Sequence, residues 1–132
     1  MKSIMLSIHP QYAQAIMDST KQFEYRRRGP VWSVFGARLV LYATAPVSAV
    51  VGEAGAIIWH NTPEVIWQHT QYAAGIPEAD FYAYFLGCEF GTVFEIVSTK
   101  LYQSLRPLSD WGVLRPPQSW QYVGIDDASL WR

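Results

Sequence analysis

The sequence is poor in cysteine, and Cys88 is the only one among its 132 residues. A single cysteine excludes an intrachain disulfide and any metal site built from several cysteines. The three histidines, His9, His60 and His69, are too scattered to provide the ligand spacing of a zinc site. We therefore expect no metal and no cofactor, and we interpret Cys88 as a small apolar side chain in preference to a reactive thiol.

Long apolar runs and an excess of one charge are also missing. The first apolar stretch, at residues 3–8, is too short for a signal peptide or a membrane span, so we predict a cytoplasmic protein with no membrane partner. A formal net charge of −1 gives no overall field that would attract nucleic acid. Affinity for phosphate must then come from a local cluster, and the chain has one in Lys21, Arg26, Arg27 and Arg28, which Arg38 can join.

Apolar residues, by contrast, are abundant enough for one hydrophobic core. Half of the residues are hydrophobic and 16% are charged, which is typical of a globular protein, and the length suits a single domain over residues 1–132. Alternation and turn signals predict strands at 3–8, 21–28, 37–44, 47–59 and 91–105, a short strand ending at 123, and helices at 9–20, 61–75 and 77–87. This order favours an α+β fold, a small mixed sheet curled into a partial barrel with helices at its mouth.

Polar residues gather where the first predicted helix meets the strand after it. Ser7 and His9 precede the helix, whose free N–H groups favour anions. Glu24, Arg26 and Arg28 alternate along the strand and so share one face. Two interpretations remain open. The face is either a solvated surface with a Glu–Arg pair contributing ~1 kcal/mol or less, or the wall of a cleft in which an arginine binds phosphate or a base edge.

Three further groups are candidates for the same pocket. Tyr42 and Thr44 end a strand and suit a cavity floor, and Glu53 either faces solvent or pairs with Arg26 or Arg28. The turn after two prolines presents an amide, a hydroxyl and an aromatic ring, from Gln118, Ser119 and Trp120. Trp120 fits core packing as well as stacking on a base.

Three stretches, at residues 6–28, 39–55 and 114–123, resemble the ASCH domains of the PUA-like superfamily, in particular the branch described as predicted transcriptional regulators. The most specific piece is the G-x-K-x-x-E-x-R signature. It corresponds here to "STKQFEYR", residues 19–26, with Ser19 in place of the glycine. Strict alternation would place Lys21 with Phe23 and Tyr25, opposite Glu24, so a break near the start of the strand is needed to turn it into a cleft.

The resemblance implies a small mixed β-barrel with helices flanking a cleft between the first helix and the signature strand. Relatives are thought to bind RNA or modified nucleobases there, which favours a site with Lys21, Glu24 and Arg26. We therefore predict a nucleic-acid-binding or modified-nucleotide-binding module, with a regulatory role, whose partner is RNA, another single-stranded nucleic acid or a nucleoside. A protein-interaction domain that uses exposed aromatic residues is a further alternative.

The resemblance also implies an enzymatic alternative, because some ASCH proteins deacetylate an acetylated cytidine and others cut RNA. The deacetylating type uses the signature lysine, a threonine three residues later and a glutamate before a later helix. Lys21 matches, but Glu24 stands in the threonine position and residues 73–75 carry no carboxylate. If the protein is a hydrolase or ribonuclease, Lys21 is its catalytic base, with Glu24 or Glu53 as partner.

Overall fold

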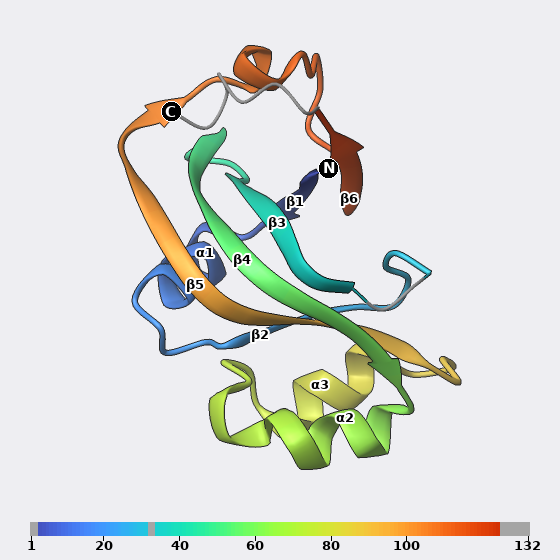
Figure 1. Ribbon diagram of the computed structural model, residues 1–132. Coiled ribbons are helices and arrows are strands. Elements are labelled where there is room, and N and C mark those ends of the chain that lie inside the picture. Colours follow the sequence, from blue (N-terminus) through green and yellow to red (C-terminus); the bar gives the residue numbers. More distant parts are fainter. Residues whose placement is uncertain (1–2, 32–33, 125–132) are drawn as a thin grey trace.

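The computed structural model describes residues 3–31 and 34–124. Within these ranges six strands form a mixed sheet in the order β2-β5-β4-β3-β1-β6 (Figure 1). They are β1 (Ser3–Ile8), β2 (Phe23–Arg26), β3 (Val34–Ala43), β4 (Ala49–Asn61), β5 (Gly91–Arg106) and β6 (Trp120–Val123). Neighbouring β1 and β3 are parallel, and the other four neighbouring pairs are antiparallel.

Three α-helices accompany the sheet: α1 (Pro10–Met17), α2 (Pro63–Thr70) and α3 (Glu78–Tyr84). Thr62 caps α2, since its hydroxyl accepts a hydrogen bond from the Val65 N–H at 3.4 Å. The predicted helix at 61–75 is shorter in the structure. Thr70 donates its hydroxyl back to the Ile66 carbonyl, and the chain then continues as a 3₁₀ turn, η1 (Gln71–Ala73).

Glycines in β4 let the sheet bend. The β4–β5 register shifts between Val50 and Gly52 and again between Gly55 and Ala56, as the two glycines predict. A side chain at Gly52 would lie 2.5 Å from the Lys100 carbonyl oxygen, so only glycine permits this close approach of the strands.

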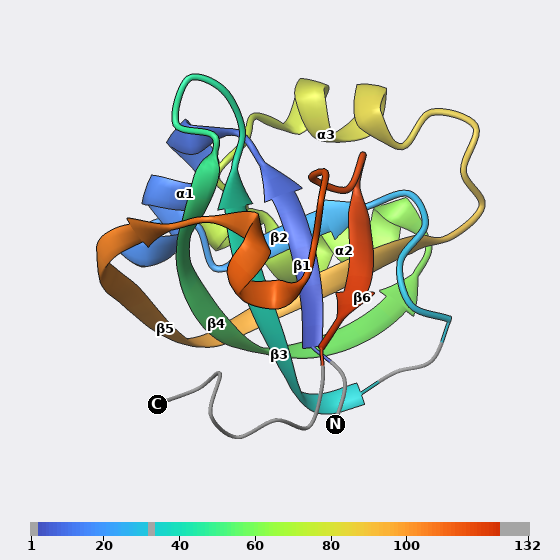
Figure 2. The ribbon, with the colours of Figure 1, turned by 90° about the horizontal axis from the view of Figure 1, so that it is seen from above.

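The sheet curls so far that its two edge strands, β2 and β6, come together. Arg26 at the end of β2 donates from Nη1 to the carbonyl and hydroxyl oxygens of Ser119, each at 3.1 Å. Trp120 in β6 donates from Nε1 to the Arg28 carbonyl at 2.8 Å. Side-chain hydrogen bonds therefore connect the two edges of the half-barrel, which are not paired as strands. The curvature of the sheet is visible from above (Figure 2).

The apolar core is divided by the curved sheet. One cluster fills the half-barrel beneath α1 and centres on Leu6, Ile16 and Leu39. A second joins β2 and β5 to α2 and α3, which lie together at one end of the sheet (Figure 1). The predicted α+β partial barrel is therefore confirmed. Among the described residues, no helix has the length and apolar character needed to cross a membrane.

Candidate nucleic-acid-binding cleft

A cleft of about 550 Å³ lies where α1 begins, β2 ends and the loop before β6 returns. The end of β1, the residue directly after β3 and the helix α3 also line it. Eight of the residues predicted from the sequence line it together: Ser7, His9, Lys21, Glu24, Arg26, Thr44, Gln118 and Ser119.

Lys21 enters the cleft because it precedes β2. The helix α1 ends in a Schellman motif, in which Thr20 N–H donates to the Ala15 carbonyl and Ser19 N–H to the Ile16 carbonyl. Ser19 has a φ of 68°, the left-handed conformation that glycine adopts most easily. This turn occupies the glycine position of the signature, and it aims Lys21 toward Glu24 before strand alternation begins at Phe23.

The ammonium group of Lys21 is buried, with the residue only 1% exposed. Its Nζ donates to the Ala74 carbonyl at 2.6 Å and lies 3.5 Å from Glu24 Oε1. The same atom lies 5.0 Å from the centre of the Tyr25 ring and 5.4 Å from that of Tyr12. Burial lowers the pKa of Lys21, the Glu24 carboxylate opposes that shift, and the nearby Arg26 charge adds to it.

Glu24 links the lysine to the arginine. Its Oε2 accepts from Arg26 Nη2 at 2.7 Å, and both side chains are 10% exposed. The same Nη2 donates to the Ser7 carbonyl at 3.0 Å, in addition to the two bonds that Nη1 makes with Ser119. The Lys21–Glu24–Arg26 network thus holds two cations around one carboxylate in the wall of the cleft, which stabilises an anion placed against them.

Neighbouring groups keep this wall rigid. Ser7 donates its hydroxyl to the Pro117 carbonyl at 2.5 Å, which fixes the loop that carries Gln118 and Ser119. The Tyr25 hydroxyl donates to Thr70 Oγ1 at 2.8 Å, and burial raises the pKa of Tyr25 to about 12, so the phenol stays neutral. The site is therefore organised before any ligand binds.

Two predicted residues lie elsewhere. Tyr42 packs with Met5, Val40 and Trp111 in a third apolar cluster, away from the cleft. Glu53 pairs with Arg38 and accepts from the Tyr102 hydroxyl at 2.8 Å, in place of the pairing with Arg26 or Arg28 that the sequence suggested. The physical reason is register, because Glu53 lies opposite Val40 and Lys100 in the middle of the sheet.

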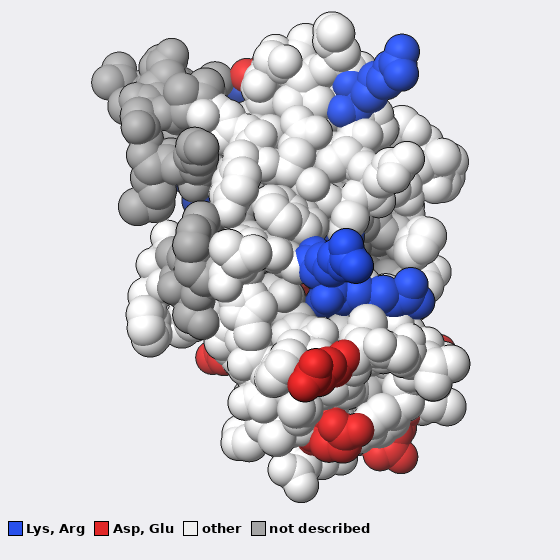
Figure 3. Space-filling view, turned by 90° about the vertical axis from the view of Figure 1, so that its right-hand side faces the viewer, with Lys and Arg blue, Asp and Glu red and all other residues white. Residues whose placement is uncertain are grey.

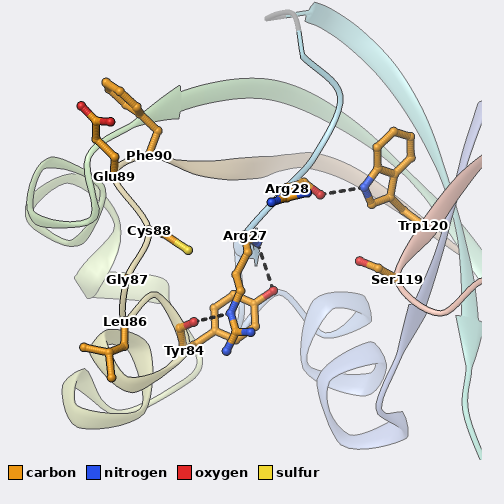
Figure 4. Close-up of a pocket in the computed structure, with 10 residues that line it drawn as sticks. All are labelled: Arg27, Arg28, Tyr84, Leu86, Gly87, Cys88, Glu89, Phe90, Ser119 and Trp120. Carbon is orange, nitrogen blue, oxygen red and sulfur yellow. Dashed lines mark hydrogen bonds between the residues drawn. The ribbon is translucent and has the colours of Figure 1, made fainter.

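Arg28 and Trp120 line a second pocket beside the cleft, of about 910 Å³ (Figure 4). Alternation predicted that Arg28 would share a face with Glu24 and Arg26, but β2 ends at Arg26 and the chain turns away. Figure 3 shows one face of the molecule, in which cationic side chains gather in the middle. Acidic side chains gather below them, over its helical end.

Several residues of the cleft were not predicted from the sequence. Tyr12 lines it from the first turn of α1. Tyr84 and Asp80 reach it from α3, a helix far away in the sequence. Only the pairing of β2 with β5 and the packing of α3 bring these residues near Lys21, so no local pattern could have identified them.

Comparisons with known proteins agree with this architecture. No protein-family model matches the chain. A protein of Zymomonas mobilis subsp. mobilis named ASCH domain-containing ribonuclease is 33% identical over 110 residues, which are 82% of this chain and 71% of that protein.

Solved structures of ASCH from Zymomonas mobilis are similar over almost the whole chain. One crystal structure has a TM-score of 0.86 at 27% identity and covers 98% of this chain and 93% of that one. A mutant protein of ZmASCH has a TM-score of 0.85 at 26% identity and covers 98% and 95% of the two chains. At this identity and coverage, in sequence and in structure, the chain belongs to the ASCH domain family.

Proposed function

We propose that this ASCH protein binds single-stranded RNA and that one nucleotide lies in the cleft. The observation that carries the proposal is the Lys21–Glu24–Arg26 network, two buried cations and one carboxylate in the wall of a cleft of about 550 Å³. A space of this size suits a nucleotide, since small-molecule sites span roughly 300–1,000 Å³. The Zymomonas relative is named a ribonuclease, which supports RNA as the class of ligand.

Each group in the cleft has chemistry suited to part of a nucleotide. Lys21 and Arg26 attract the phosphate, while Tyr12 and Tyr84 offer aromatic surface to the base. Gln118 is exposed at the cleft and can hydrogen-bond a base edge. The net charge of −1 favours contact with few phosphates, as in a short single strand, over a long duplex track.

Cleavage of the bound RNA is a second candidate, favoured by the lowered pKa of Lys21 and by the name of the relative. A neutral Lys21 takes the proton of a ribose 2′-hydroxyl. The 2′-oxygen attacks phosphorus as the bond to the 5′-oxygen breaks, which leaves a 2′,3′-cyclic phosphate. The 5′-oxygen takes a proton from water, and the protonated Lys21 returns its proton to the hydroxide that remains. Arg26 stabilises the charge that develops on phosphorus oxygens.

Hydrolysis of a modified nucleoside and the predicted regulatory role remain predictions. Residues 73–75 carry no carboxylate, yet Asp80 lines the cleft from the first turn of α3. An acetylated cytidine therefore belongs among the compounds to be tested.

The test is a titration of labelled single-stranded RNA into wild-type protein and a Lys21→Met variant, which removes the charge and keeps most of the volume. We expect the variant to bind about tenfold more weakly or worse, the loss of roughly one charged hydrogen bond. Lys100→Met is the matched control, because Lys100 is exposed on β5 and lines neither pocket.

Mass spectrometry of the recovered RNA and of a nucleoside panel separates the candidates. An intact ligand supports a binding protein, whereas a shortened RNA or a lost acetyl group that requires Lys21 supports an enzyme. Equal affinity of the wild type and Lys21→Met, with both proteins folded by thermal unfolding, would overturn the placement of the nucleotide.

A further inference from the structure

The second pocket, about 910 Å³ in volume, opens directly beside the cleft. Tyr84 and Ser119 line both hollows, so the two meet along these residues. Arg26, in the cleft wall, holds Ser119 through two hydrogen bonds. An RNA strand that leaves the cleft beside Ser119 therefore passes directly into the second pocket.

Arg27 and Arg28 make this pocket cationic. Both are exposed, and Figure 4 shows them between Tyr84 and Trp120. Arg27 donates from Nε to the Tyr84 carbonyl at 2.5 Å, and its guanidinium carbon lies 4.8 Å from the centre of the Tyr84 ring. This contact fixes the guanidinium and leaves its terminal Nη groups available to a ligand.

The Arg28 side chain makes no hydrogen bond or ion pair with any residue in 3–31 or 34–124. Glu89 also lines the pocket, but Figure 4 shows its carboxylate directed away from both arginines. The two cations are therefore not neutralised by a carboxylate within the described part of the pocket. An anion is the complementary ligand.

Trp120 forms the opposite wall. Its Nε1 donates to the Arg28 carbonyl at 2.8 Å, and its ring meets Tyr122 edge to face with centroids 5.2 Å apart. These contacts fix the indole while the residue stays partly exposed. A fixed aromatic ring beside two cations suits a base that is joined to a phosphate.

We propose that the second pocket is a subsite for the nucleotide adjacent to the one in the cleft, on the same RNA strand. The inference rests on the proposed function and extends it. Arg27 and Arg28 bind the phosphodiester, and the neighbouring base stacks on Trp120. The smallest ligand that uses the whole site is then a dinucleotide.

The experiment compares 5′-mononucleotides with 5′-phosphorylated dinucleotides, as mixtures of all bases, for displacement of a fluorescent RNA. A 2′-O-methyl group at the internal linkage prevents cleavage during the measurement. We expect the wild type to bind dinucleotides about tenfold or more tightly than mononucleotides, the usual gain from one stacked base and a phosphate contact.

Arg28→Ala should remove most of this gain and leave mononucleotide affinity unchanged. It should also make dinucleotide binding less sensitive to salt. The slope of the logarithm of the association constant against the logarithm of the salt concentration should become shallower by about 0.7, the value for one single-stranded phosphate contact. Lys100→Ala is the control for loss of an exposed cation, and an Arg27→Ala, Arg28→Ala double variant should abolish the gain.

The outcomes distinguish the two proposals. If mononucleotides bind through Lys21 but dinucleotides bind no more tightly, the subsite is wrong and the cleft stands. If the gain persists in the double variant, the subsite is again wrong. If neither ligand binds the wild type, both proposals fail together.

Discussion

The Nζ atom of Lys21 lies 3.5 Å from Oε1 of Glu24, although the lysine side chain is only 1% exposed. The carboxylate partly compensates the burial of the ammonium group but does not cancel it, so the pKa of Lys21 is lowered. The stability of the fold is therefore coupled to the protonation of Lys21.

The stability of the protein should depend on pH through Lys21. Its folded pKa lies below the ordinary value of 10.5, so the unfolded chain binds the proton more tightly. The free energy of unfolding should therefore rise as the pH rises from the folded pKa toward 10.5, by about 1.4 kcal/mol for each pKa unit of difference. Urea unfolding of the wild type and Lys21→Met, between about pH 7 and pH 10, checks this.

In Lys21→Met the contribution of the lysine is gone, and its curve against pH should be flatter than that of the wild type. Above about pH 10 the raised pKa of Tyr25 acts in the opposite direction in both proteins, so the comparison stops there. Parallel curves would show that Lys21 has the same pKa folded and unfolded.

Gly75 should be required for the position of Lys21. It has a φ of 74°, and a Cβ atom there would lie 2.7 Å from Lys21 Cγ. Gly75→Ala should destabilise the fold by ~1 kcal/mol or more through backbone strain and should weaken RNA binding about as much as Lys21→Met. Gly112→Ala is the matched control, because Gly112 has a φ of 70°, has open space around it and lines neither the cleft nor the second pocket. If both variants bind RNA equally well, Gly75 does not position the lysine.

Ser19→Gly should stabilise the protein. Ser19 adopts a left-handed φ of 68° at the end of α1, which costs a non-glycine residue roughly 1–2 kcal/mol, and the extra freedom of glycine in the unfolded chain offsets part of the gain. We expect a net increase of about 0.5–1 kcal/mol in the free energy of unfolding by urea titration. Gln14→Gly, in the interior of α1, should instead cost about 1 kcal/mol. A loss of stability in Ser19→Gly would contradict the strain.

Glu53→Gln should reduce stability without affecting RNA binding. The substitution weakens the bonds to Arg38 and Tyr102, and we expect a cost of about 1–2 kcal/mol. RNA affinity should be unchanged, because Glu53 lies outside the cleft. Glu24→Gln is the comparison and should weaken RNA binding as well. Weaker RNA binding by a folded Glu53→Gln would return this residue to the site, as the sequence had suggested.

Much of the fold was predictable because its signals are local. Alternating apolar residues, the Thr62 cap and the glycines of β4 each act over a few residues, and each has its expected effect in the structure. The length of the helix after Thr62 was not predictable from the cap. The hydroxyl of Thr70 and the 3₁₀ turn that follows it end α2 early.

By itself the sequence determined the elements, the α+β class and the signature residues Lys21, Glu24 and Arg26. The tertiary structure decided which other residues join them. Strand register places Glu53 outside the cleft, and the end of β2 at Arg26 places Arg28 outside it. The packing of α3 brings Tyr84 into the cleft. The reason is physical: strand alternation and helix caps act between near neighbours, whereas a cleft forms where the curled sheet brings β2 and β6 together, and that curvature is a property of the whole sheet.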